Sequence, residues 1–193
     1  MPSRLVGLVK ALAWTDFQGN PDPQKPNLQA FTHASFNMPV WSPVPIPGTR
    51  TGHFEDNLVI TISMDPQRSW KRNPPNDLLR HEQGHYDITA LIARDLFIDL
   101  MALKANTYPT AAAGLADLRV VLDRYNNKTS RINTIYDSMQ QTNHGNIPTA
   151  QTRWNGMIQR AFSEPRVPQM TAPDGAVYKV QFLDVLGQNG INP

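Results

Sequence analysis

The chain has 193 residues, of which 40% are hydrophobic and 18% charged. These values are typical of a globular protein and exclude an intrinsically disordered chain. The formal net charge of +2, without a run of Lys or Arg, does not predict a nucleic-acid-binding surface, and the absence of cysteine excludes disulfides and thiolate metal ligands.

Residues 1–75 read as strands and proline-rich loops. The clearest strand is "NLVITISMD", because Leu58, Ile60, Ile62 and Met64 recur at every second position. A second candidate strand is "AFTHASFNMPVW". The opening "MPSRLVGLVKALAW" predicts no signal peptide, and no segment approaches the roughly 20 apolar residues of a membrane span.

Residues 76–163 are predicted to be helical. "NPPND" offers Asn76 or Asp77 as a cap for a helix that continues to about Lys104. "ANTYPTAAAG" then reads as a connection to a second long helix, loosened at "NNKTS" and ended by "TNHGN", where Gly145 can terminate it. A shorter helix follows from about residue 149 to 162.

The C-terminal part, residues 164–193, is predicted as a loop and a closing strand, through "APDGAVYKVQFLDV". We therefore expect one α+β domain over residues 1–193. Its N-terminal, mostly antiparallel sheet would pack on the first long helix, with the second helix antiparallel to the first.

The stretch "LLRHEQGHYDI" carries a His-Glu-x-x-His motif on the first long helix. Each helical residue advances by about 100°, so His81 and His85 lie within about 40° of each other, one turn apart. Two imidazoles so placed bind one Zn²⁺, and Glu82 beside them can act as general base. Zinc is favoured because magnesium and calcium prefer oxygen ligands. Asp87, about 140° round the helix, is expected to make a structural hydrogen bond.

A catalytic zinc site usually has three protein ligands. His144 in "TNHGN" is the predicted third ligand, because two antiparallel helices that reverse near residues 105–114 return the chain to the level of His85. Tyr136, two turns earlier, is a candidate oxyanion donor, with packing of the helical hairpin as the alternative.

These segments together resemble a known family. "LLRHEQGHYDITALIARDL" and "YDSMQQTNHG", with "LAWTDFQGNPDP", "AFTHASF" and "SWKRN" upstream, resemble a bacterial family of predicted secreted zinc-dependent proteases, formerly a domain of unknown function. The resemblance covers most of the chain, roughly from Trp14 to Trp154. It implies a zincin-type metallopeptidase with His81 and His85 as zinc ligands and Glu82 as base, and it supports His144. It also implies a secreted or periplasmic protein.

The sequence thus predicts a zinc-dependent endopeptidase acting on a protein or peptide substrate, with "NLVITISMD" as the strand beside the cleft, by analogy with zincins. One alternative is a zinc-binding interaction module without catalysis, in which His33 or His53 closes a four-ligand site. Another is a metallohydrolase that acts on a cell-wall or other non-protein amide. The sequence does not indicate an oligomeric state.

Overall fold

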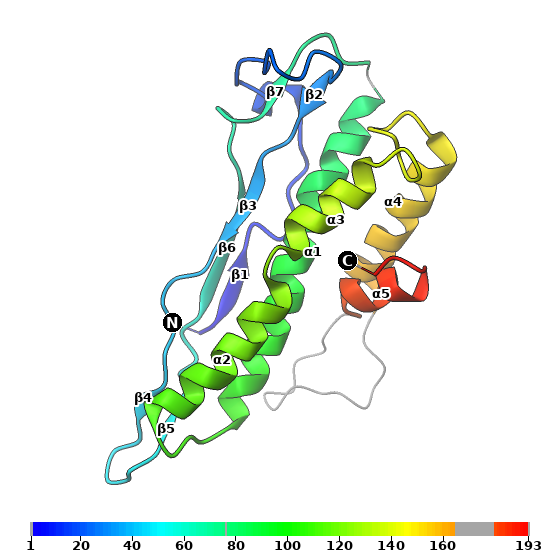
Figure 1. Cartoon of the computed structure of the whole chain (residues 1–193). Coiled ribbons are helices and arrows are strands. Elements are labelled where there is room, and N and C mark those ends of the chain that lie inside the picture. Colours follow the sequence, from blue (N-terminus) through cyan, green and yellow to red (C-terminus); the bar gives the residue numbers. More distant parts are fainter. Residues whose placement is uncertain (1, 76, 165–179, 193) are drawn as a thin grey trace.

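A computed structural model describes residues 2–75, 77–164 and 180–192. Strands come first along the chain and helices follow (Figure 1). The strands are β1 (Arg4–Val6), β2 (Ala30–Phe31), β3 (Ala34–Asn37), β4 (Val44–Pro45), β5 (Gly52–His53), β6 (Val59–Met64) and β7 (Trp70–Lys71). The helices are α1 (Leu78–Ala102), α2 (Ala111–Tyr125), α3 (Lys128–Asp137), α4 (Pro148–Ser163) and α5 (Phe182–Gln188), with short 3₁₀ helices at Trp14–Asp16 and Leu103–Ala105. The predicted α+β class is confirmed.

The main sheet has three strands in the order β1–β6–β3. Its central strand, β6, pairs in parallel with β1 and antiparallel with β3. The alternation expected for β6 is confirmed, because Leu58, Ile60, Ile62 and Met64 are all buried. The single strand predicted for residues 30–41 is instead divided: β2 pairs antiparallel with β7, whereas β3 pairs with β6.

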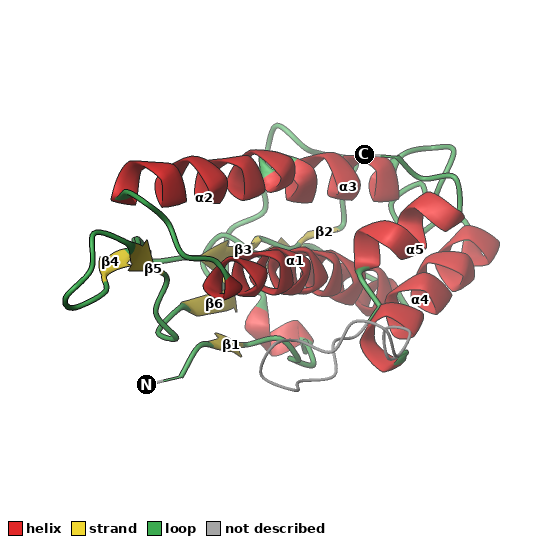
Figure 2. Cartoon of the chain, turned by 90° about the horizontal axis from the view of Figure 1, so that it is seen from below, coloured by secondary structure: helices red, strands yellow, loops and turns green. Residues whose placement is uncertain are grey.

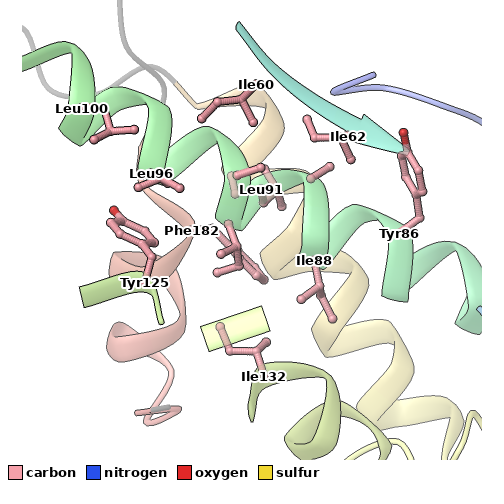
Figure 3. Close-up of a cluster of buried hydrophobic side chains, with 14 of the residues drawn as sticks. Ile60, Ile62, Tyr86, Ile88, Leu91, Leu96, Leu100, Tyr125, Ile132 and Phe182 are labelled. Carbon is pink, nitrogen blue, oxygen red and sulfur yellow. The ribbon is translucent and has the colours of Figure 1, made fainter. Parts of the chain in front are cut away.

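Helix α1 is the central element of the fold. It runs through the middle of the molecule, with strands on one side, α2 and α3 on another, and α4 and α5 on a third (Figure 2). Figure 3 shows Ile60 and Ile62 of β6 on one side of α1 and Ile132 and Phe182 on the opposite side. Each fully buried side chain of this kind stabilises the fold by about 1.5–3 kcal/mol, so the core holds α1 from several sides.

The predicted second long helix is two helices, α2 and α3, which run antiparallel to α1 (Figure 1). The break lies at Asn126 and Asn127, where Asn127 has a φ of +62° that no α-helix allows. Helix α3 ends at Asp137, before "TNHGN", and His144 and Gly145 have φ values of +52° and +83° in the following turn. The early end of α3 places a carboxylate at the C-terminus of the helix.

The last described element corrects the predicted closing strand. Phe182–Gln188 is helix α5, whose buried residues Phe182, Val185 and Leu186 share one face at helical spacing. The rest of the predicted strand, residues 172–179, lies outside the described residues. Helix α4, expected from about residue 149, begins at Pro148 in the first turn, where proline is favoured.

A buried ion pair fastens the C-terminal helices to α1. Arg94 contacts Asp95 at 3.0 Å and donates to the carbonyl oxygens of Ala161 and Val180, and Asp95 accepts the backbone N–H of Leu183. None of the described helices is both long and apolar enough to cross a membrane.

Candidate metal centre

The first turns of α1 bring three polar side chains into the interior. His81 and Glu82 are 2% and 3% exposed, and the two histidine rings lie 4.8 Å apart and nearly perpendicular. Because histidines four residues apart share one face of a helix, both rings turn toward α3. The arrangement predicted for the two histidines is therefore present.

Asp137 lies where the two imidazoles converge. Its Oδ1 atom is 3.0 Å from Nε2 of His81 and 3.1 Å from Nε2 of His85. One potential ligand atom from each of these three residues lies within 4.8 Å of the others. A cation between them would have two nitrogen ligands and one carboxylate, a donor set found in catalytic zinc sites.

The charges of this group are strongly coupled. Burial lowers the pKa of His85, but the hydrogen bond and charge of Asp137 outweigh this effect and raise it to about 9. Burial also raises the pKa of Asp137, yet the hydrogen bonds from His81 and His85 hold it well below its usual range. Without a metal, the site thus favours a protonated imidazole facing a carboxylate, and a metal cation competes with that proton.

A threonine from the strand region orients the carboxylate of Glu82. The Thr32 hydroxyl, between β2 and β3, lies 2.6 Å from Oε2 of Glu82 and 3.3 Å from its backbone oxygen. Thr32 itself is 7% exposed, so this contact is inside the protein. The buried carboxylate of Glu82 is therefore held in one orientation beside the two histidines.

Two carboxamides contact the other nitrogen of each ring. Nδ1 of His85 lies 2.7 Å from Oδ1 of Asn133 on α3, and Nδ1 of His81 lies 3.1 Å from Oε1 of Gln151 on α4. Partners in this position set the ring orientation and the tautomer of metal-binding histidines.

Tyr136 packs directly on His81. The two rings stack 4.6 Å apart, and the Tyr136 hydroxyl donates to the backbone oxygen of His81 and accepts from Gln151. An added Cβ at Gly84 would lie 2.2 Å from that hydroxyl oxygen, which explains why glycine stands inside the motif. The hydroxyl predicted as an oxyanion donor is thus engaged by two protein groups, in agreement with the packing alternative.

His144, the predicted third ligand, lies at the margin of this group. Its Nδ1 atom is 3.6 Å from Oδ1 of Asp137, and its side chain is 46% exposed. It lines the same cavity of about 90 Å³ as His81, Glu82 and His85. The turn expected from the sequence does bring His144 back to the motif, although Asp137 is closer to both rings.

The remaining histidines and Asp87 lie outside the group formed by His81, His85 and Asp137. His33 lines a larger groove beside β3, and His53 belongs to β5. Asp87 accepts a hydrogen bond from Gln83, as expected for a structural role, and burial raises its pKa to about 6.

A larger groove, of about 800 Å³, borders the group formed by His81, His85 and Asp137. One wall is formed by residues 31–36 and the other by the end of α2 and by α3, with His85 and Asp137 among its lining residues. Six consecutive residues of one wall face the groove. Because side chains of a strand alternate between its two faces, this lining indicates that the groove follows the edge of β3.

Asp137 is the residue that sequence reasoning missed. The third ligand was predicted to be a histidine, whereas aspartates are scattered through this chain. A signal was available: Asn133 and Asp137 are four residues apart on one helix, as His81 and His85 are on another, so each helix presents two polar groups on one face.

Comparison of the chain with models of protein families, with curated proteins and with solved structures found no match. The resemblance to zinc-dependent proteases therefore stays a prediction, and the case for function depends on the geometry of the site.

Proposed function

We propose that this protein is a zinc-dependent endopeptidase with a zincin-like active site. The observation that carries the proposal is the convergence of Nε2 of His81, Nε2 of His85 and Oδ1 of Asp137 beside the buried carboxylate of Glu82. A structural zinc site has no need for a carboxylate at that position, whereas hydrolysis needs a base there.

The donor set fits zinc. Imidazole nitrogen suits Zn²⁺ and related transition metals, whereas magnesium and calcium favour sites made of oxygen ligands. The site also contains two carboxylates, the buried Glu82 and the partly exposed Asp137, whose charge a divalent cation would offset. His81, His85 and Asp137 would hold the ion, and His144 is close enough to be a fourth contact.

Within this site, Glu82 is the general base. When bound, zinc supplies a Lewis acid that favours deprotonation of water and stabilises negative charge on a carbonyl oxygen. Glu82, with one oxygen held by Thr32, accepts the proton from water and donates it to the leaving amine. Such proton transfer contributes about 10²–10⁴-fold to the rate.

The groove beside β3 supports an extended peptide as the substrate. The sequence pointed to β6 as the strand beside the cleft, but β6 lies between β1 and β3 and has neighbours on both edges. In the described sheet, β3 is an outer strand and follows the groove. A peptide chain can pair with such an edge through its backbone, so β3 is the better candidate.

A non-catalytic zinc module is the second candidate, and one observation favours it. His144, 3.6 Å from Asp137, could complete a closed set of four ligands. His33 and His53, the residues first considered for that role, are not part of the group whose atoms converge, although His33 lines the larger groove.

The test measures bound zinc and casein cleavage for the wild type and Glu82→Gln. We expect one zinc per chain in both proteins, and a loss of cleavage of about 10²-fold or more in the variant. Glu82→Asp, which retains a shortened base, is the matched control and should keep a fraction of the activity. Zinc binding without cleavage in the wild type would support the non-catalytic module, and undiminished cleavage by Glu82→Gln would exclude the mechanism.

A further inference from the structure

Two neutral carboxamides surround the metal centre, and their orientations follow from their other contacts. Asn133 donates through Nδ2 to the backbone oxygen of Thr129, at 2.9 Å. Its Oδ1 atom is therefore the atom that faces Nδ1 of His85. An amide oxygen can only accept, so the hydrogen of this contact belongs to His85.

The orientation of Gln151 is determined in the same way. The single hydroxyl proton of Tyr136 is donated to the backbone oxygen of His81, so the Tyr136 oxygen accepts an N–H from Gln151. The Nε2 group also donates to Asn155, at 2.8 Å. This leaves Oε1 of Gln151 to accept from Nδ1 of His81.

We propose that Asn133 and Gln151 are positioning residues of the metal centre, which keep the proton of His85 and of His81 on Nδ1 and direct both Nε2 atoms to the cation. The inference rests on the proposed zinc site, and it adds the two residues that fix the tautomer of the histidine ligands. Both residues act through the histidines, because each faces an Nδ1 atom on the side of the ring away from Asp137, and Asn133 also lines the groove beside β3.

The choice of amides rather than carboxylates has a chemical consequence. A carboxylate at either position would add negative charge next to a ligand and make the imidazole a stronger donor. Asn133 and Gln151 orient the rings without that charge. The Lewis acidity of a bound cation is then reduced only by Asp137 among its ligands, which suits a catalytic site.

The first experiment reads the tautomers directly in the wild-type protein. With ¹⁵N-labelled histidine and one equivalent of zinc, long-range ¹H–¹⁵N spectra should show a protonated Nδ1 and a metal-bound Nε2 for both His81 and His85. A metal-bound Nδ1 at either residue would overturn the proposal, and no variant has to fold for this result.

The second experiment compares metal affinity and the visible absorption spectrum of the Co²⁺-loaded protein. We expect Asn133→Leu and Gln151→Leu each to weaken zinc binding about 10–100-fold, the usual effect of removing such a partner, and to shift the cobalt bands. Asn133→Asp and Gln151→Glu retain an acceptor and should bind zinc at least as tightly as the wild type.

Matched controls are available nearby. Gln140→Leu removes an exposed amide from the turn after α3, and Gln159→Leu removes one from the exposed face of α4. Both should keep wild-type affinity and spectrum. Unchanged affinity and spectrum in folded Asn133→Leu and Gln151→Leu would overturn the role proposed here while leaving the zinc site intact. A wild type that binds no zinc would overturn both proposals.

Discussion

Helix α1 carries two buried polar clusters about 15 Å apart along its axis, and they differ in how their charges are balanced. In the C-terminal cluster, the charge of Asp95 is matched by Arg94. Arg94 also donates hydrogen bonds to two backbone carbonyl oxygens, and Asp95 accepts one from a backbone N–H group. In the N-terminal cluster, Asp137 and Glu82 lie beside two imidazoles and a cavity. In the first cluster an ion pair within the protein balances the two charges, although Nε of Arg94 has no hydrogen-bond partner among the described residues, whereas in the second cluster protons or a metal cation would balance the carboxylates. We therefore propose a structural role for the first cluster and a metal-binding role for the second.

Removing Asp95, the acid of the C-terminal cluster, should have the largest effect on stability. Asp95→Ala leaves Arg94 buried without its counter-charge, and breaking such a pair typically costs about 3–5 kcal/mol. Urea unfolding measures this loss. Asp184→Ala, at an exposed position of α5, is the control and should change stability little. Equal stability of the two variants would contradict the structural role.

Removing Asp137 from the N-terminal cluster should affect metal binding instead. Asp137→Ala removes a proposed ligand, and we expect zinc affinity to fall by at least about 100-fold, or about 2.7 kcal/mol. His144→Ala, which removes the more distant group, should have a smaller effect. Isothermal titration with zinc compares the two. A larger loss in His144→Ala would restore His144 as the third ligand.

A substitution at Gly84, inside the motif, tests how closely helix α1 and Tyr136 are packed. Gly84→Ala places a Cβ 2.2 Å from the Tyr136 hydroxyl oxygen, and overpacking of this kind costs about 1–3 kcal/mol. Gly156→Ala on α4 meets nothing within 4 Å, so it should be neutral or stabilise the protein by up to about 1 kcal/mol. Thermal unfolding gives both values, and stabilisation by both variants would show that Tyr136 does not pack there.

The smallest expected effect concerns the orientation of the base. Thr32→Val removes the hydroxyl that contacts Glu82 and keeps the shape of the side chain. We expect cleavage to fall about 10-fold, equivalent to about 1.4 kcal/mol, with zinc affinity unchanged. Thr152→Val, on the exposed side of α4, is the control. A parallel loss of zinc would mean that Thr32 supports the metal site as a whole.

The sequence predicted the parts of the fold that depend on regular spacing. Strand β6 and helix α1 have long apolar repeats, so both were found with nearly correct limits. The break between α2 and α3 coincided with "NNKTS", because asparagine tolerates the positive φ of Asn127. Helix α5 was mistaken for a strand, since a short run such as Phe182–Leu186 fits both periods until its packing is known.

The site was predicted only in part, because one of its residues depends on tertiary packing. His81, Glu82 and His85 form a local motif that can be read along one helix. Asp137 depends on where α3 ends and on how α3 packs against α1, and both follow from tertiary contacts. His144 was found because it is one of only five histidines, whereas no such rarity distinguishes Asp137.

The most direct test of the central claim is a crystal structure of the zinc-loaded protein, with anomalous diffraction measured on both sides of the zinc absorption edge. We predict one strong zinc peak about 2.0–2.2 Å from Nε2 of His81, Nε2 of His85 and a carboxylate oxygen of Asp137. A zinc peak away from these three residues, or none at full zinc saturation, would contradict the claim.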